Sequence, residues 1–175
     1  MPKALPNLLL ISGTGQNSGK TTLACRLIAC FAKQFPVTAI KISPHFHEPP
    51  PQLPVIAAYE GFVIYEEIQY GTGKDSSRFL DAGAKRIYFI TTQQEKQGAA
   101  MEILLEKIPE NTPVICEAGG LHHYFKPALH IVAIRKNKPP QKQIPQSADV
   151  VVEFDGVGFT PEVEVRWSGE GWSFL

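Results

Sequence analysis

The chain lacks an imbalance of charge and a long hydrophobic run. Its 17 basic residues match its 17 acidic residues, so the formal net charge at pH 7 is zero. A chain that is neutral as a whole is not drawn to nucleic acid or to a membrane surface, and we expect neither partner. No stretch approaches the ~18 apolar residues that predict a membrane span, and no long apolar segment precedes the first predicted strand. We therefore expect a cytoplasmic protein.

Cysteine is also scarce. Cys25, Cys30 and Cys116 are odd in number, lack CxxC spacing and have apolar neighbours. These features favour reduced thiols in the core over a disulfide framework or a metal site.

The histidines do not make up for the missing metal ligands. His45 and His47 alternate along the chain, whereas His122 and His123 are adjacent and cannot readily point at one ion. We interpret them as solvent-exposed or phosphate-contacting groups. On an extended segment, His45 and His47 would share one face beside Lys41 and could contact a substrate.

Glycine, in contrast, recurs at positions 13, 15 and 19 within the segment of residues 13–22, which follows an apolar run and leads into a predicted helix. Such a turn points backbone N–H groups and the positive end of the helix dipole at one spot, which suits a polyphosphate. Lys20 can reach the β- and γ-phosphates, and the Thr21 hydroxyl is placed to ligate a bridging Mg²⁺. Thr14 stands where the standard motif has its first glycine. We predict a phosphate-binding loop (P-loop) that includes Gly13, Gly15, Asn17, Ser18, Gly19, Lys20, Thr21 and Thr22.

Short apolar runs alternate with helix-like segments along the whole chain, as in a largely parallel sheet with helices on its faces. The predicted strands cover residues 8–12, 37–42, 86–91, 114–117, 130–135 and 150–154, and residues 62–65 suggest an extra strand. The predicted helices cover residues 19–34 and 93–108. Near the C-terminus, Val163, Val165 and Trp167 alternate with charged residues, which predicts a hairpin on the sheet edge. The predicted fold is a single α/β domain, residues 1–175: a P-loop NTPase three-layer sandwich with a mostly parallel sheet and an antiparallel C-terminal edge hairpin.

Glu117 ends one of the predicted strands and is followed by Ala118-Gly119-Gly120. Its carboxylate would lie at the carboxyl edge of the sheet, where open α/β folds bind ligands. It could hold Mg²⁺ through water or orient an attacking water. A purely structural Glu117 would need a nearby cation, because buried carboxylates are rarely left unpaired.

Lys74, Asp75 and Arg78 are spaced to share the first turn of a further helix. Asp75 could cap that helix or hold a metal-bound water, and Arg78 could contact a phosphate or a partner chain. The alternative is a capped surface helix with an internal ion pair. Lys41, at the end of the second strand, is either a second phosphate contact or a solvated lysine.

These segments together resemble the MobB family, the molybdopterin-guanine dinucleotide biosynthesis adaptor proteins. The resemblance rests on the glycine-rich loop, on Ile40-Lys41 before a histidine-containing turn, and on Gly-Lys-Asp-Ser-x-Arg leading to Ala-Gly-Ala over residues 73–84. It covers about the first two thirds of the chain. The family's acidic cluster after the second strand is missing, and Glu48 is the only carboxylate in residues 44–51. Pro140 occupies the place of the guanine-reading aspartate in the segment Asn137-Lys138-Pro139-Pro140.

The resemblance implies a dimeric GTP-binding protein with weak hydrolysis that assists attachment of a guanine nucleotide to the molybdenum cofactor, working with an enzyme of that pathway. The alternative is an ATP-dependent ligase or kinase similar to dethiobiotin synthetase, with a small-molecule pocket lined by Lys41, His45 and Glu117. A noncatalytic relic is a third alternative. For the favoured adaptor, the expected ligands are GTP or ATP with Mg²⁺. The candidate residues are Lys20, Glu117 and Asp75 for catalysis, Thr21 and Glu117 for the metal, and Lys41 and Arg78 as further nucleotide contacts.

Overall fold

Helices and strands alternate along most of the chain in the computed structural model, which describes residues 1–46, 48 and 50–175. The strands of the main sheet are β1 (Lys3–Gly13), β2 (Thr38–Ser43), β3 (Val55–Tyr59), β4 (Phe62–Glu66), β5 (Arg86–Thr92), β6 (Val114–Glu117), β7 (Phe125–Arg135), β8 (Val150–Phe154) and β9 (Phe159–Thr160). The α-helices are α1 (Lys20–Phe31), α2 (Asp75–Asp81) and α3 (Gln97–Leu105), with short 3₁₀ turns η1 (Gln94–Lys96) and η2 (Leu121–His123). Strands β10 (Val165–Trp167) and β11 (Trp172–Phe174) form a second, small sheet.

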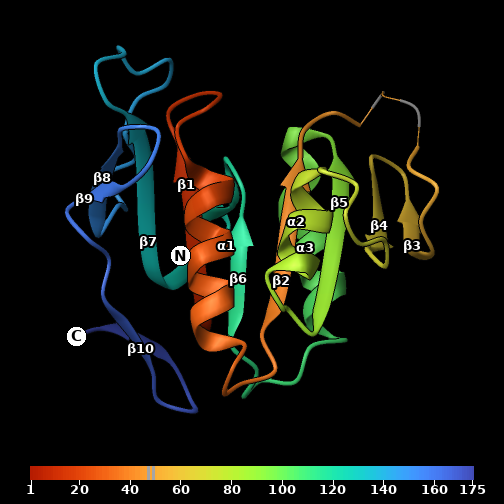
Figure 1. The fold of residues 1–175 in the computed structure, drawn as a ribbon. Helices are drawn as coiled ribbons and strands as arrows, with labels where there is room; N and C mark the ends of the chain where they lie inside the picture. Colours follow the sequence, from red (N-terminus) through yellow and green to blue (C-terminus); the bar gives the residue numbers. More distant parts are fainter. Residues whose placement is uncertain (47, 49) are drawn as a thin grey trace.

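The main sheet has the order β3-β4-β5-β2-β6-β1-β7-β8-β9 (Figure 1). Every pair from β5 through β8 is parallel, and the antiparallel pairs lie at the two edges. The fold is therefore α/β with a mostly parallel mixed sheet, as predicted. The extra strand predicted over residues 62–65 is β4. Its hairpin partner β3 was not predicted, because the prolines that precede it gave no strand signal.

Helices cover both faces of this sheet, so the molecule has three layers. Along β1, Leu9 and Ile11 face α1 and α2, whereas Leu8 and Leu10 face α3, and all four are almost completely buried. Burial on both faces explains why residues 8–11 of β1 form a continuous apolar run without polar alternation. The carboxyl ends of the parallel strands consequently meet at one edge of the sheet.

The C-terminal hairpin exists, but its predicted place on the edge of the main sheet is wrong. The edge beyond β8 is occupied by β9, and β10 and β11 pair only with each other among the described residues. Val165, Trp167 and Trp172 pack into the core cluster on the α1 side, and the Trp172 indole donates a hydrogen bond of 2.9 Å to the Asn7 carbonyl. The alternation therefore reflects one apolar face that covers the core.

Helix boundaries differ from the prediction at three places. Helix α1 ends at Phe31, three residues earlier than expected, and residues 32–34 continue as turns. Helix α3 begins at Gln97 after the 3₁₀ turn η1 and ends at Leu105. Lys74 has an extended backbone and precedes α2, so it does not share that helix's face with Arg78. No helix in the described part of the chain is long and apolar enough to cross a membrane.

Candidate functional site

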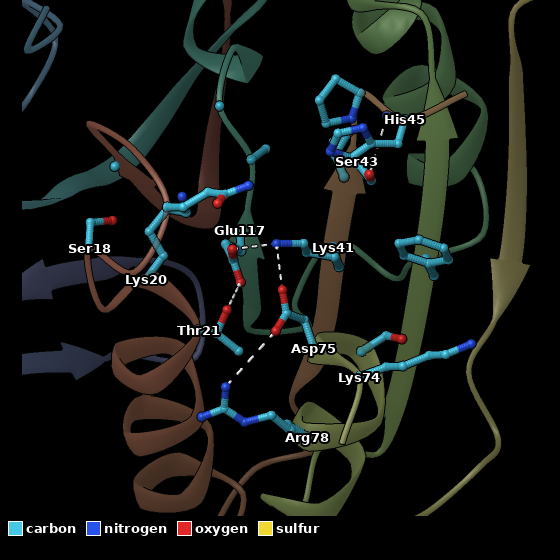
Figure 2. Close-up of a pocket in the computed structure, with 18 of the residues that line it drawn as sticks. Ser18, Lys20, Thr21, Lys41, Ser43, His45, Lys74, Asp75, Arg78 and Glu117 are labelled. Carbon is cyan, nitrogen blue, oxygen red and sulfur yellow. Dashed lines mark hydrogen bonds and ion pairs between the residues drawn. The ribbon is translucent and has the colours of Figure 1, made fainter. Parts of the chain in front are cut away.

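A cleft of about 1460 Å³ lies at the carboxyl edge of the parallel strands. The glycine-rich loop after β1, the ends of β2 and β6, the start of α2 and the loop after β7 line it (Figure 2). The described lining residues include seven lysines and arginines but only four aspartates and glutamates. The chain as a whole is neutral, so positive charge is concentrated at this cleft, which favours an anionic ligand.

The glycine-rich loop reaches α1 through Gly19, whose φ of +92° favours glycine. A Cβ at Gly19 would lie 2.5 Å from the Phe154 ring, so a larger residue does not fit. Within the loop, the Lys20 ammonium donates a hydrogen bond of 3.0 Å to the Gly15 carbonyl. The Ser18 hydroxyl is buried, and no hydrogen-bond partner for it is found in the described part of the chain.

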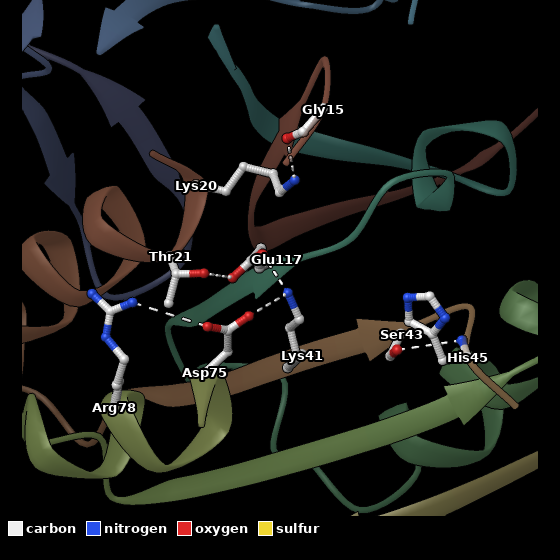
Figure 3. Close-up of polar contacts among 9 residues, drawn as sticks. All are labelled: Gly15, Lys20, Thr21, Lys41, Ser43, His45, Asp75, Arg78 and Glu117. Atoms are coloured by element: carbon white, nitrogen blue, oxygen red, sulfur yellow. Dashed lines mark hydrogen bonds and ion pairs between the residues drawn. The ribbon is translucent and has the colours of Figure 1, made fainter. Parts of the chain in front are cut away.

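Glu117 lies at the centre of the cleft floor and is only 1% exposed. Its carboxylate accepts a hydrogen bond of 2.9 Å from the Thr21 hydroxyl, and its other oxygen is paired with the Lys41 ammonium (Figure 3). The structure thus brings together the loop residue Thr21, the β2 residue Lys41 and the β6 residue Glu117. It also supplies the cation that a buried Glu117 requires.

Lys41 joins the floor of the cleft to its wall, because its ammonium also lies 3.1 Å from an Asp75 carboxylate oxygen. Burial alone would lower the pKa of Lys41, but the charges and hydrogen bonds of Glu117 and Asp75 outweigh it and raise that pKa. Lys41 is therefore held in its charged form. With 17% of its side chain exposed and two carboxylate partners, Lys41 is not the solvated lysine of one alternative, and its role as a second phosphate contact stays a prediction.

Lys20 has the opposite electrostatics. Burial lowers its pKa, the attraction of Glu117 opposes that shift, and Lys41 and Lys142 lower it further. Except for its bond to the Gly15 carbonyl, the ammonium has no hydrogen-bond or ion-pair partner in the described residues. A bound anion would relieve the cost of keeping this cation desolvated.

Asp75 and Arg78 lie at the rim, where each side chain is more than 40% exposed. They are 3.9 Å apart, the separation of a weak ion pair within one helix. The first turn of α2 is fixed by Glu67, a buried carboxylate that accepts a hydrogen bond of 2.6 Å from Ser76. Sequence reasoning missed Glu67, because a single glutamate after a short strand carries no signal of its own.

The loop after β7 also belongs to the cleft and was not among the predicted site residues. The backbone N–H groups of Gln141 and Lys142 both donate to the Thr14 carbonyl, over 2.8 and 3.1 Å, so this loop is fastened to the glycine-rich loop. Arg135 and Lys138 line the same end of the cleft. The signal was available, because β7 is parallel to β1 and the loop after it must emerge at the same edge.

The histidines divide between two places. His45 stands at the rim, 3.5 Å from Glu48, and His47, for which a substrate contact was predicted, lies outside the described residues. His122 packs against His123 and His130, and none of the three lines the cleft. No group of three or more histidines, cysteines and carboxylates that could hold a metal is found among the described residues. The Thr21 hydroxyl and the Glu117 carboxylate are nevertheless the hard oxygen donors that suit Mg²⁺ in company with phosphate oxygens.

Comparisons of the chain with protein-family models, with curated proteins and with solved structures find no match.

Proposed function

We propose that the protein is a P-loop protein that binds the Mg²⁺ complex of a nucleoside triphosphate in this cleft. The observation that carries the proposal is the contact between the Thr21 hydroxyl and the buried Glu117 carboxylate beside the glycine-rich loop. A loop hydroxyl and a strand-end carboxylate side by side form the pair of oxygen groups that holds Mg²⁺ against the phosphates of a nucleotide.

In this proposal each part of the loop has one task. The backbone N–H groups of residues 15–21 and the positive end of α1 bind the phosphates, as they would any polyanion at a helix N-terminus. Lys20 exchanges its bond to the Gly15 carbonyl for the β- and γ-phosphates. Bound Mg²⁺ would neutralise phosphate charge, with Thr21 as a direct ligand and Glu117 as a direct or water-mediated one.

The residues favour slow hydrolysis. Rapid attack by water needs an oriented nucleophile and added positive charge at the transition state. Glu117 on the floor and Asp75 at the rim both form ion pairs with Lys41, so neither is an unpaired base for an attacking water. Arg78, the cation closest to Asp75 after Lys41, lies at the exposed rim. A protein of this kind would act through the state that its nucleotide stabilises.

The resemblance described above makes the proposal more specific: a cytoplasmic, MobB-like GTP-binding adaptor with weak GTPase activity in molybdenum cofactor biosynthesis, active as a homodimer with an enzyme of that pathway. The support is the sequence of the loop and of residues 73–84, together with the ion pairs that join Asp75, Lys41 and Glu117. GTP is favoured over ATP by the resemblance alone.

A second function is favoured by the size of the cleft. It extends past the glycine-rich loop to His45, Lys74 and Phe89, which leaves room for a small molecule beside the γ-phosphate. An ATP-dependent ligase or kinase similar to dethiobiotin synthetase would need such room.

Calorimetric titration of GTP and of ATP, each with Mg²⁺, tests the proposal in the wild type and in Lys20→Ala. We expect one nucleotide to bind and the variant to lose about 100-fold in affinity, roughly the worth of a desolvated charge-assisted contact. Burial makes the charged form of Lys20 unfavourable in the folded protein. Removal of this side chain should therefore not lower the urea midpoint of unfolding. Lys126→Ala, an exposed lysine of β7 outside the cleft, is the matched control.

Preference for GTP would support the adaptor, and preference for ATP would support the ligase or kinase. Equal binding by wild type and Lys20→Ala, or binding of neither nucleotide, would overturn the proposal.

A further inference from the structure

We infer that Lys142, in the loop after β7, is a second phosphate-binding cation. Together with Lys20 it holds the terminal phosphates of the nucleotide, so that the site selects a nucleoside triphosphate over the diphosphate. This inference rests on the proposed function, because it adds one contact to the same bound nucleotide. The loop, residues 136–149, connects β7 to β8 and is hydrogen-bonded to the glycine-rich loop.

The backbone brings Lys142 to the part of the glycine-rich loop that Lys20 contacts. The Lys142 N–H donates to the Thr14 carbonyl over 3.1 Å. The Lys20 ammonium donates to the carbonyl of the next residue, Gly15, over 3.0 Å (Figure 3). The Gln141 side chain lies against Gly15 as well, because a Cβ there would be 2.7 Å from its Oε1. The two lysines therefore meet at adjacent residues of one loop.

Their charges also act on each other. Both side chains line the cleft. Burial is the main cause that lowers the pKa of Lys20, and of the positive charges nearby, those of Lys41 and Lys142 lower this pKa most. Lys41 is neutralised by its two carboxylate partners. The Lys142 ammonium, in contrast, forms no hydrogen bond or ion pair with the described residues. An unpaired cation beside Lys20 is unfavourable until an anion binds between them.

The other cations of the cleft are placed for other tasks. Arg78 is paired with Asp75 at the rim, 3.9 Å away. The Arg135 guanidinium lies over the Phe154 ring, 5.1 Å from its centre. Lys142 is thus the cleft cation that is both unpaired and coupled to Lys20.

A cation beside Lys20 favours the longer phosphate chain. Lys20 can reach the β- and γ-phosphates, and Lys142 would attract the same groups. Because the attraction grows with the negative charge of the ligand, removal of Lys142 should weaken triphosphate binding more than diphosphate binding. Hydrolysis stays slow in this account, since Lys142 supplies charge but no group that orients a water.

Calorimetric titration of three Mg²⁺ complexes tests the inference: the β,γ-imido analogue of whichever nucleotide binds, the corresponding diphosphate, and inorganic tripolyphosphate. Lys142→Ala should lose about tenfold in affinity for the analogue and about threefold or less for the diphosphate, as expected for one exposed charge-assisted contact. Lys142→Arg keeps the charge and should restore most of the affinity. Both variants keep the backbone N–H that binds the Thr14 carbonyl.

Lys136→Ala is the matched control. Lys136 is an exposed lysine of the same loop and lies outside the cleft, so its removal changes the net charge equally. Its affinities should equal those of the wild type. The inference is overturned if Lys142→Ala binds the analogue as the wild type does, if Lys136→Ala loses as much, or if analogue and diphosphate lose affinity equally.

The three ligands separate this inference from the proposed function. Nucleotide binding that needs Lys20 but not Lys142 would support the function and overturn the inference. Tripolyphosphate binding that needs both lysines, with no binding of either nucleotide, would contradict the function and support the pairing of the two cations. Failure of all three ligands to bind would overturn both.

Discussion

The floor and the rim of the cleft use the same kind of ion pair in different surroundings. On the floor, Glu117 is 1% exposed and binds both Lys41 and Thr21. At the rim, Asp75 is 43% exposed and binds Lys41 and, weakly, Arg78. Buried charges depend on their partners, because without them they would be desolvated with no compensation, whereas exposed charges can turn to water. The comparison suggests that the floor fixes the structure and that the rim is free to respond to a ligand.

Replacement of the floor carboxylate should have the largest effect on stability. Glu117→Gln keeps the shape and the contact with Thr21 but removes the main counter-charge of buried Lys41, so we expect a loss of about 3 kcal/mol in unfolding free energy. Urea denaturation followed by circular dichroism measures it. Glu153→Gln, an exposed carboxylate on β8, is the control and should change stability by less than about 0.5 kcal/mol. Equal midpoints for the two variants would contradict a structural floor.

A smaller loss should follow from alkaline pH. The pKa of Lys41 is raised in the folded protein above its ordinary value of 10.5, so its contribution is fully present below pH 10.5 and is lost as the pH rises through the folded pKa. The difference in unfolding free energy between wild type and Lys41→Met should therefore shrink as the pH is raised from 10.5 through the folded pKa. A difference that stays constant over this range would exclude the pairing of charged Lys41 with Glu117.

The hydrogen bond from the loop to the floor should contribute less than the ion pair. Thr21→Val removes the hydroxyl that donates to Glu117 but keeps the side-chain shape, so we expect a loss of about 1 kcal/mol and a weaker effect of Mg²⁺ on nucleotide affinity. Thr22→Val, the neighbouring threonine in α1, is the matched control for stability, since the Thr22 hydroxyl makes no hydrogen bond to a side chain or carbonyl of the described residues. The two variants are compared by urea denaturation. Similar losses of unfolding free energy in both variants would show that the hydrogen bond from Thr21 to Glu117 does not stabilise the fold.

The rim should have the smallest effect on stability. Asp75→Asn removes an exposed charge, and Lys41 remains paired with Glu117 in this variant. We therefore expect the unfolding free energy to change by about 0.5 kcal/mol or less. The same denaturation experiment measures it. A loss of unfolding free energy as large as that of Glu117→Gln would mean that the rim stabilises the fold as much as the floor does, which would contradict the difference between them.

The loop and the floor differ in how far the sequence could predict them. Gly19, Lys20 and Thr21 are neighbours in sequence, so local spacing alone was enough to propose their common site. The position of Glu117 at the strand end was predictable, and so was its need for a cation. The sequence could not predict that this cation is Lys41, because the order of the strands decides which residues are neighbours across the sheet.

The same limit applies to the rest of the fold. Strands β1, β2, β5, β6, β7 and β8 were predicted because each carries a dense apolar run. The hairpin of β10 and β11 was recognised from its alternation, but alternation does not say which surface its apolar face covers. Strand β3 follows a proline-rich segment, and all five of its residues are apolar or aromatic, so its sequence shows no alternation that separates a buried face from an exposed one.

The most direct test of a nucleotide in this cleft is a crystal structure of the protein with Mg²⁺ and the β,γ-imido analogue of whichever nucleotide binds. We predict the phosphates against residues 15–21, with Lys20 turned from the Gly15 carbonyl to the phosphates and Mg²⁺ beside Thr21 and Glu117. Phosphates bound elsewhere in the cleft, with Lys20 still on the Gly15 carbonyl, would contradict the assignment of this loop as the nucleotide site.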